Sequence, residues 1–214
     1  MNIPIIISGG GLIGNYISLR LRKSGIQSKI IEKSNDLYDS NSSIRTITLN
    51  PRSIKLLQNE GIEISSSSIK NIFASDADGT GRINFSSDDI GYKELSSVIM
   101  FNELNAVLRK ENVSNTLFNT EIKSINYDSA NEETEIHLSN STYYKSDLLI
   151  ACDGRSSNVA KLYGFKNIGH SYDQTAATFL VNASAKTIMR IKFFLKRNIC
   201  IMQHKGYILQ WFGL

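Results

Sequence analysis

The chain has 214 residues, 41% of them hydrophobic and 21% charged, which is the composition of a folded globular protein and excludes a disordered chain. The net charge of +4 is spread along the sequence without a Lys/Arg cluster, which argues against a nucleic-acid-binding protein. Two cysteines without CxxC spacing and three histidines without a paired motif predict neither a disulfide framework nor a metal site.

A strand, a helix and a second strand are predicted in the first 32 residues. Residues 3–8 are a short β-branched run bounded by glycine, which is typical of a buried strand. Residues 12–23 carry apolar side chains at largely helical spacing, and Gly25 follows as a C-terminal cap. Residues 27–32 form the second strand. A strand–helix–strand unit of this length predicts a parallel pair of strands with a right-handed crossover.

The middle of the chain mixes helices with short strands. Pro51 suits the first turn of a helix over residues 51–61, and Gly61 ends it. The other predictions here are a surface turn at residues 65–68, strands at 69–74 and 82–85 around the turn D-A-D-G-T-G, and an amphipathic helix at 102–110.

The hydrophobic period then changes to that of strands. Residues 121–127, 134–138 and 142–144 alternate in strand fashion and predict an antiparallel meander. Residues 148–152 are a continuous buried strand that ends in the turn D-G-R-S-S, and the pattern from Ala176 onward is mostly strand-like. The fold class is therefore α/β, with an inserted meander and part of a mixed β-sheet.

Three glycines at the end of the first strand match G-x-G-x-x-G. They precede a helix within a strand–helix–strand unit, which is the context that gives this pattern meaning. Gly9 permits a tight turn, Gly11 allows a pyrophosphate to approach the backbone, and Gly14 allows close helix packing. Glu32, at the end of the second strand, can accept hydrogen bonds from ribose hydroxyls and would repel a 2′-phosphate. These residues predict an ADP-ribose ligand without that phosphate, as in NAD or FAD.

The inserted meander resembles the glutathione-reductase type of Rossmann-like FAD-binding domain rather than a plain NAD domain. The stretch L-L-I-A-C-D-G-R-S-S-N-V-A-K-L-Y-G is similar to the D-G-x-x-S motif of the flavoprotein aromatic hydroxylases, with Asp153, Gly154 and Ser157 in place. Lys161 stands where that motif usually has an arginine, so the charge is kept and the bidentate geometry is lost.

Three further segments resemble the ubiquinone-biosynthesis hydroxylases. L-S-S-V-I-M-F-N-E-L-N-A-V-L is similar to their L-G-Y-x-x-x-N-x-x-L segment, with Asn102 at the asparagine. H-S-Y-D-Q-T-A is similar to their Y-x-Q-x-A segment through Tyr172, Gln174 and Ala176, and the stretch around Arg45 is similar to R-x-x-x-L. The four resemblances follow one another in the order found in that family.

The resemblance implies an FAD-dependent monooxygenase that hydroxylates a polyprenylated phenol in ubiquinone biosynthesis. NAD(P)H would reduce the flavin, and one oxygen atom of O₂ would pass to the ring. No catalytic side chain is assigned. The implied cofactor residues are Gly9, Gly11, Gly14 and Glu32 for the ADP half, Arg45 and Asn102 near the ribityl and pyrophosphate side, and Asp153 and Gly154 at the ribityl–pyrophosphate region.

Structural roles are open for several of these residues. Arg45 can be a solvated surface side chain, Asn102 can cap the helix that it begins, and Ser157 can start a turn or a helix. Cys152 suits core packing. The predicted domains are an FAD-binding domain over residues 1–70 and 97–168 and a partial substrate domain over residues 71–96 and 169–214.

The sequence departs from that family at its second flavin motif. No G-D dipeptide occurs in the 214 residues, so the expected G-D-A-A-H segment is missing and an N-terminal piece of a longer enzyme is predicted. Three alternatives stay open: pairing with a separately encoded C-terminal fragment, a nucleotide-binding but inactive remnant, and an NAD-dependent reductase. No apolar run reaches the ~18 residues of a membrane span, so a cytoplasmic protein is expected, and a greasy substrate leaves peripheral membrane contact open.

Overall fold

The computed structural model describes residues 2–35, 44–76, 80–130, 132–166, 168–169, 175–180, 189–195, 198–203 and 208–213, with side chains up to residue 169 except that of Asp76. The chain divides into two compact units, Met1–Asp39 with Asn105–Ile168 and Ser40–Leu104 with Gly169–Leu214. Compactness assigns no function to either unit, so the predicted cofactor and substrate domains stay a prediction. Tyr172 and Gln174 lie outside the described residues.

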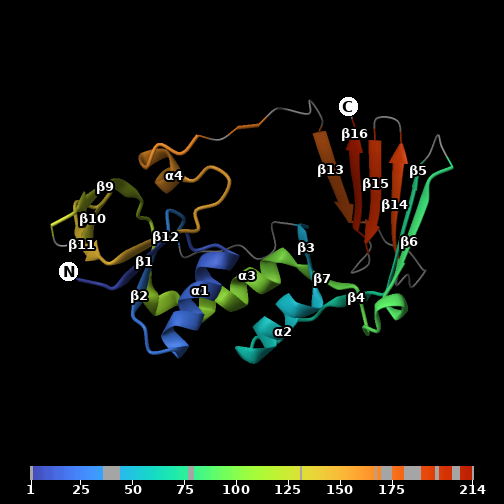
Figure 1. Ribbon diagram of the computed structural model, residues 1–214, viewed down its shortest axis with the longest axis horizontal. Coiled ribbons are helices and arrows are strands. Elements are labelled where there is room, and N and C mark those ends of the chain that lie inside the picture. The colour runs from blue at the N-terminus through green and yellow to red at the C-terminus, as the bar shows by residue number, and fades with distance from the viewer. Residues whose placement is uncertain are drawn as a thin grey trace. The chain divides into compact units, whose positions relative to one another are not determined.

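The first unit is built on a four-stranded parallel sheet (Figure 1), in the order β12-β1-β2-β8. Its strands are β1 (Ile5–Ser8), β2 (Ser28–Ile31), β8 (Thr116–Leu117) and β12 (Leu148–Ala151). Helix α1 (Leu12–Lys23) connects β1 to β2, so the predicted strand–helix–strand unit and its parallel pairing are confirmed. In the sheet Ser8 pairs with Ile31 on one side and with Ala151 on the other. The carboxyl ends of three strands therefore lie at one edge.

Both faces of this sheet are covered, which explains its continuous apolar strands. On one face Ile6 and Ile31 belong to a buried cluster with residues of the meander and of helix α4 (Asn158–Leu162). The meander, as predicted, consists of β9 (Ile122–Asp128), β10 (Glu133–Leu138) and β11 (Tyr143–Ser146). Helix α1 covers the other face, where Ile7 and Leu19 are fully buried.

Gly9 and Gly14 are required by the way β1, α1 and β12 pack together. Gly9 has φ +100°, and a Cβ there would lie 2.5 Å from the carbonyl oxygen of Cys152. A Cβ on Gly14 would lie 2.0 Å from the carbonyl oxygen of Gly9. Neither distance is compatible with a side chain, so the tight turn and the close helix packing predicted for these two glycines are confirmed.

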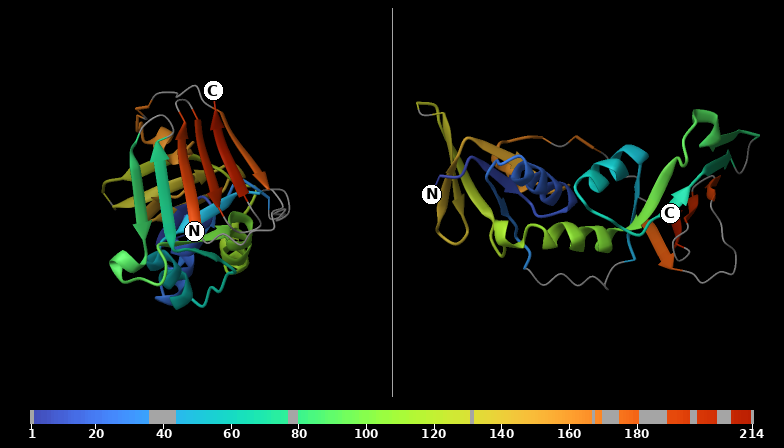
Figure 2. Two further views of the ribbon diagram at one scale, coloured as in Figure 1. Left: turned by 90° about the vertical axis from the view of Figure 1, so that its right-hand side faces the viewer. Right: turned by 90° about the horizontal axis from the view of Figure 1, so that it is seen from below.

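The second unit contains two sheets. The smaller one is antiparallel, in the order β3-β7-β4, and helix α2 (Pro51–Asn59) contacts β7. Its strands are β3 (Thr46–Leu49), β4 (Ser67–Ile69) and β7 (Ser96–Met100). The larger sheet has the order β13-β16-β15-β14-β5-β6, and its strands lie side by side in the left panel of Figure 2. They are β5 (Asn71–Asp76), β6 (Arg82–Ser86), β13 (Thr175–Leu180), β14 (Met189–Leu195), β15 (Asn198–Gln203) and β16 (Ile208–Gly213).

Several elements of the second unit differ from the sequence-based predictions. The serine run at residues 65–68 was expected to be a turn, but Ser67–Ile69 is strand β4, which pairs with β7. Strands β3 and β7 were not predicted, because each is short and becomes a strand by pairing with a segment distant in the chain. Helix α3 (Phe101–Lys110) begins one residue before Asn102, so Asn102 lies in its first turn and is not its N-cap.

Predicted helix ends are confirmed where glycine sets them. Gly25 after α1 has φ +74° and Gly61 after α2 has φ +73°, the left-handed conformation that ends a helix.

Short 3₁₀ turns lie at Asp88–Ile90 and at Val113–Asn115, before β7 and β8. The carboxyl-terminal half of α3, from Asn105, belongs to the first unit.

The contact between Gly14 and the Gly9 carbonyl leads to a stability prediction. Gly14→Ala should lower the free energy of unfolding by about 3 kcal/mol, the upper end of the usual cost of overpacking, because the new methyl group would meet rigid backbone. Urea unfolding of the ligand-free chain measures this. Gly11→Ala is the matched control, since a Cβ at Gly11 has no atom within 4 Å. Equal stability of the two variants would contradict the packing described for β1 and α1.

Candidate functional site

A cavity of about 320 Å³ opens at the sheet edge where β1, β2 and β12 end. Three of the residues predicted from the sequence line it: Gly9, Glu32 and Asp153. They meet there because the amide N–H of Gly9 donates to the Ile31 carbonyl over 2.9 Å and that of Cys152 to the Ser8 carbonyl over 2.7 Å, which continues the parallel pairing past the strands. The cavity also receives Lys33, Thr120, Asn158 and Lys161.

Gly11 lies at the start of α1 in surroundings that the described protein leaves open. Its φ of −76° is ordinary for any residue, it is exposed, and a Cβ there would have no atom within 4 Å. No side chain caps the amino end of α1. The amides of a first helical turn have no partner within the helix and carry the positive end of its dipole. This end of α1 can therefore receive an anionic group close to the backbone.

The carboxylate of Glu32 is held by two backbone amides. Its Oε2 accepts from the Gly10 N–H over 2.5 Å, and its Oε1 accepts from the Ser34 N–H over 2.8 Å. Arg109 of α3 donates to the carbonyl oxygen of Asn35 over 2.8 Å and so holds the segment that follows Glu32. Each carboxylate oxygen has a further lone pair, so Glu32 can still accept hydrogen bonds from a ligand.

Asp153 and Ser157 both cap helix α4. The Asp153 Oδ2 accepts from the amides of Asn158 and Val159 over 2.7 and 3.1 Å, and the Ser157 Oγ accepts from the amide of Ala160 over 3.0 Å. The helix-start role that the sequence left open for Ser157 is thus confirmed. The turn between them passes through Gly154, whose φ is +81°.

The environment of Asp153 favours its ionised form. Burial alone would raise the pKa of this carboxyl, but hydrogen bonds from Ser157 and from the amides of Val159 and Asn158 outweigh burial and lower the pKa below its usual value. The second oxygen, Oδ1, is buried without a hydrogen-bond partner in the described part of the chain. Such an acceptor can take a hydrogen bond from water or from a ligand.

The neighbouring cysteine has the opposite tendency. Burial, together with the negative charge of Asp153, raises the pKa of the Cys152 thiol. A thiol of raised pKa is a poor nucleophile at neutral pH. Cys152 was expected to pack in the core, but it is half-buried and is not among the buried core residues.

Arg45 and Asn102 belong to the second unit and are described only within it. The Arg45 guanidinium lies over the ring of Phe101, 4.2 Å from its centroid, and the Arg45 carbonyl accepts from the Phe101 amide. Asn102 is 3% exposed. The cofactor role implied for both residues stays a prediction.

Sequence reasoning missed some residues of the cavity wall. Thr120 and Asn158 line it without having been predicted. Thr120 comes shortly after β8, a strand of only two residues that leaves no hydrophobic pattern to recognise. Asn158 follows the D-G-x-x-S motif directly, so its position beside the capping serine was the one available signal.

Residues 2–206, nearly the whole chain, match a protein family described as FAD binding domain. The chain belongs to this family. Its cofactor is accordingly FAD, and its α/β fold with a parallel sheet is the fold of the FAD-binding domain in flavin-dependent monooxygenases.

Known relatives of this FAD-binding chain include Monooxygenase 1 of Arabidopsis thaliana, which is 27% identical over 160 residues, 74% of this chain and 40% of that protein. PqsL of Pseudomonas aeruginosa, solved with 2-aminobenzoylacetate, matches with a TM-score of 0.79 at 15% identity over 99% of this chain and 60% of its own. HpxO of Klebsiella pneumoniae, solved with FAD and uric acid, matches with a TM-score of 0.77 at 16% identity over 98% of this chain and 56% of its own. This chain thus spans 40% of the curated relative and 56–60% of these two structures.

The cavity and the start of α1 together offer groups that fit the ADP half of FAD chemically. The open backbone at Gly11 can take up a phosphate, and Glu32 offers a carboxylate for ribose hydroxyls. The unsatisfied Oδ1 of Asp153 is an acceptor for a further hydroxyl.

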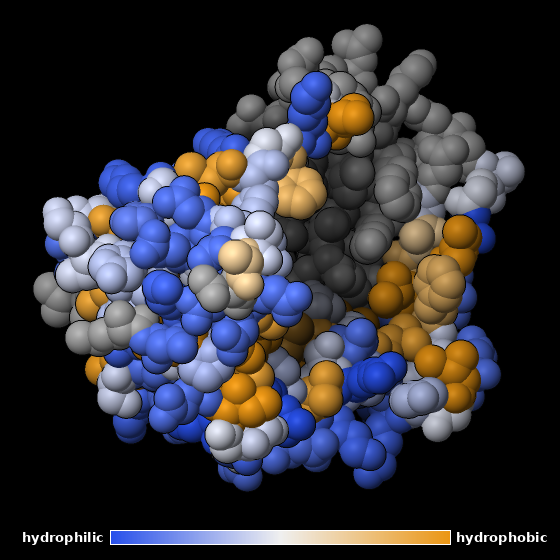
Figure 3. Space-filling model, turned by 60° about the vertical axis from the view of Figure 1, so that its left-hand side comes forward, coloured by the Kyte–Doolittle hydropathy of each residue, from blue (hydrophilic) through white to orange (hydrophobic). Residues whose placement is uncertain are grey.

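Metal clusters and membrane-spanning helices are absent from the described residues. Those residues contain no cluster of His, Cys, Asp and Glu that could hold a metal ion. Among their helices, none is long and apolar enough to cross a membrane. Figure 3 shows that the face of the first unit that is visible there is mostly hydrophilic, with apolar residues in small separate groups.

Asp153 gives a prediction about pH. Because its pKa is lowered in the folded chain, its contribution to stability is complete above the ordinary aspartate pKa of about 4 and is lost as the pH falls through the lowered value. Asp153→Ala should lower the free energy of unfolding by about 1 kcal/mol at pH 7, the usual cost of a lost cap, and the difference from wild type should shrink towards pH 2.

Urea unfolding at several pH values between 2 and 7 measures this. Asp147→Ala, at an exposed aspartate just before β12, is the control for a lost surface charge. A difference between wild type and Asp153→Ala that is constant over this range would exclude the ionised carboxylate as the cap.

Proposed function

We propose that this chain is the cofactor-binding part of an FAD-dependent monooxygenase. The observation that carries the proposal is the environment of Gly11: neither its backbone conformation nor any described neighbour requires a glycine, and it stands at an uncapped helix start. A glycine is needed there if a ligand lies against the backbone. A pyrophosphate at this position would meet the amides and the positive dipole end of α1.

Three groups around the cavity would hold the cofactor: the start of α1, Glu32 and Asp153. The amides of the first turn of α1 would offset the charge of the phosphates, and Glu32 would accept hydrogen bonds from the adenosine ribose. Asp153 is ionised at neutral pH because its pKa is lowered, so its Oδ1 would accept a hydrogen bond from a cofactor hydroxyl. The bound flavin supplies the redox chemistry, with NAD(P)H as reductant and O₂ as the oxygen source.

For the substrate, we propose a polyprenylated phenol of ubiquinone biosynthesis. The support is the resemblance of the segments around Arg45, Asn102 and Tyr172–Ala176 to the hydroxylases of that pathway. Arg45 and Asn102 would then serve the ribityl and pyrophosphate side of the flavin. The G-D-A-A-H segment, which these 214 residues lack, would come from the same protein or from a separately encoded C-terminal fragment. The greasy substrate would bring the protein into peripheral contact with a membrane. Oxygenation of a short-chain prenylated phenol by this chain together with that segment tests this.

A second candidate function is an NAD-dependent reductase, or a nucleotide-binding chain without turnover. The groups proposed to bind FAD also favour this candidate, because Glu32 and the start of α1 would bind the ADP-ribose of NAD equally well. The meander between β8 and β12 favours FAD instead, since it marks the glutathione-reductase type of domain. Two measurements distinguish the candidates. Flavin bands in the visible spectrum of the gently purified protein indicate FAD. Quenching of the protein's fluorescence by NADH, without any response to FAD, indicates the reductase.

Gly11 supplies the direct test of the site. Gly11→Val should weaken FAD binding by at least about a hundredfold, because its side chain would occupy the space of the phosphates. The free energy of unfolding without FAD should stay within about 0.5 kcal/mol of wild type, as for other exposed surface positions. Flavin fluorescence titration and urea unfolding measure the two quantities. Unchanged FAD affinity in a folded Gly11→Val protein would refute the proposed position of the phosphates.

Glu32 tests the ribose contact. Glu32→Arg should abolish FAD retention, because it removes the ribose acceptor and the carboxylate that binds the Gly10 amide. Glu121→Arg is the matched control: Glu121 lines the same cavity, but its carboxylate pairs with Lys123 at 3.1 Å. Its FAD affinity should stay within about threefold of wild type, since an exposed ion pair contributes little. Unchanged affinity in Glu32→Arg would overturn the nucleotide assignment.

A further inference from the structure

Gly9, Gly10 and Gly11 form the loop between β1 and α1, called the glycine loop below. Asn15, in the first turns of α1, is buried beneath this loop. It is 1% exposed, and its Nδ2 donates to the carbonyl oxygen of Gly10 over 2.5 Å and to that of Gly11 over 3.1 Å. The proposed cofactor contacts do not include this side chain. Its two hydrogen bonds nevertheless fix two successive peptide units of the loop on which those contacts depend.

Holding a carbonyl oxygen fixes the direction of the neighbouring amide. In a trans peptide the C=O and the following N–H point in opposite directions, and no peptide in the described chain is cis. With the Gly10 and Gly11 carbonyls turned towards Asn15, the N–H groups of Gly11 and Leu12 point away from it. Gly11 itself is exposed, and a Cβ there would have no described atom within 4 Å, so a ligand can approach this stretch of backbone.

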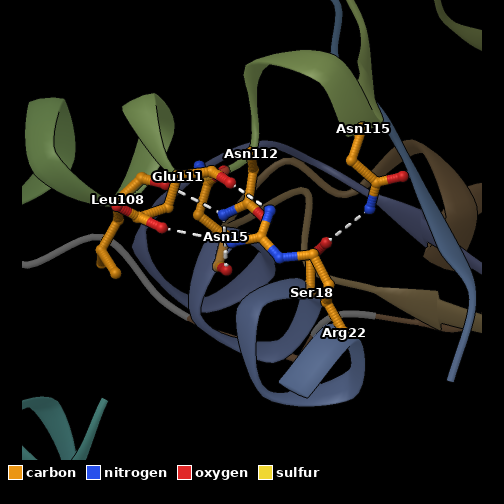
Figure 4. Close-up of polar contacts among 7 residues, drawn as sticks. All are labelled: Asn15, Ser18, Arg22, Leu108, Glu111, Asn112 and Asn115. Atoms are coloured by element: carbon orange, nitrogen blue, oxygen red, sulfur yellow. Dashed lines mark hydrogen bonds and ion pairs between the residues drawn. The ribbon is translucent and has the colours of Figure 1, made fainter. Parts of the chain in front are cut away.

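A second buried asparagine holds Asn15 from the α3 side. Asn112 is 0% exposed, and its Nδ2 donates to the backbone carbonyl of Asn15 over 3.0 Å and to that of Leu108 over 2.9 Å. Figure 4 shows Asn112 reaching across to α1 between Asn15 and Leu108. The start of α1 is thereby connected to the end of α3 by buried hydrogen bonds, which are more rigid than exposed ones.

From these contacts we infer that Asn15 is a positioning residue for the pyrophosphate of the cofactor. It touches no ligand itself. It orients the amides of Gly11 and Leu12 before the ligand arrives, so that binding does not have to order them. The inference rests on the proposed FAD site and adds to it a residue that selects for the phosphate groups rather than for adenosine.

A merely structural asparagine would behave differently. If the buried Asn15 side chain served only the packing of the first unit, its loss would loosen the whole unit and weaken the binding of every ligand alike. If it orients the amides, its loss weakens binding of ligands that carry a pyrophosphate and spares adenosine, which has none. ADP and adenosine are therefore the two probes that separate these roles.

The experiment compares three variants by titration of the ¹⁵N-labelled chain with ADP and with adenosine, followed by NMR. Asn15→Ala should bind ADP about tenfold more weakly than wild type, the usual effect of losing a buried hydrogen bond. Its adenosine affinity should stay within about threefold of wild type. Asn15→Ser should lie between wild type and Asn15→Ala for ADP, because a serine hydroxyl can donate to the carbonyl four residues earlier, here that of Gly11.

Asn115→Ala is the matched control, because Asn115 lies in the 3₁₀ turn Val113–Asn115 and its side chain contacts α1 one turn beyond Asn15. The Asn115 Nδ2 donates to the Ser18 Oγ over 2.9 Å, and Figure 4 shows this contact apart from the one between Asn112 and Asn15. Its loss should leave ADP affinity within about threefold of wild type. In wild type and in Asn115→Ala, ADP should shift the amide resonances of Gly11 and Leu12, and in Asn15→Ala these shifts should be reduced at equal saturation.

Two results would overturn the inference while leaving the FAD site intact. One is wild-type ADP affinity in Asn15→Ala, and the other is an equal loss for ADP and adenosine. If Asn15→Ala does not fold, Asn15→Ser decides by the same two criteria. Failure of the proposed function looks different, because the wild-type chain would then bind neither FAD nor ADP.

Discussion

The contact on which the site depends is the close approach of α1 to β1 and of β1 to β12. It exists because Gly9 and Gly14 have no side chains: a Cβ at either position would lie 2.5 Å or less from a carbonyl oxygen. The same contact brings the ends of β1, β2 and β12 to one edge, where Gly9, Glu32 and Asp153 surround the cavity. Packing and cofactor binding therefore have a common cause in these glycines.

The loop between β1 and α1 is held from both sides before any ligand binds. Glu32 accepts from the amide of Gly10, and Asn15 donates to the carbonyl of the same residue. Asn112 then connects Asn15 to the α3 side. Such preorganisation lowers the ordering cost of binding, so the affinity of the site depends on residues that lie behind the loop as well as on those that face the ligand.

Asp153 shows that structural and ligand roles can reside in the two oxygens of one carboxylate. Oδ2 caps α4, and the hydrogen bonds from that helix and from Ser157 keep the group ionised. Oδ1 is left as a buried acceptor without a partner in the described residues. If the D-G-x-x-S motif is interpreted only as a cofactor signature, its second role is missed. That role is to fold the turn between β12 and α4.

The sequence by itself determined the features that depend on neighbours along the chain: the first strand–helix–strand unit, the meander, the glycines that end helices, and the positions of Gly9, Gly11, Gly14 and Glu32. Tertiary structure alone decided what depends on distant segments. β3, β4 and β7 become strands by pairing with one another, and Asn15 meets Asn112 across 97 residues. The period of a strand or helix is a local property of the backbone, whereas a buried polar side chain acquires its role from whichever group the fold brings within hydrogen-bond distance.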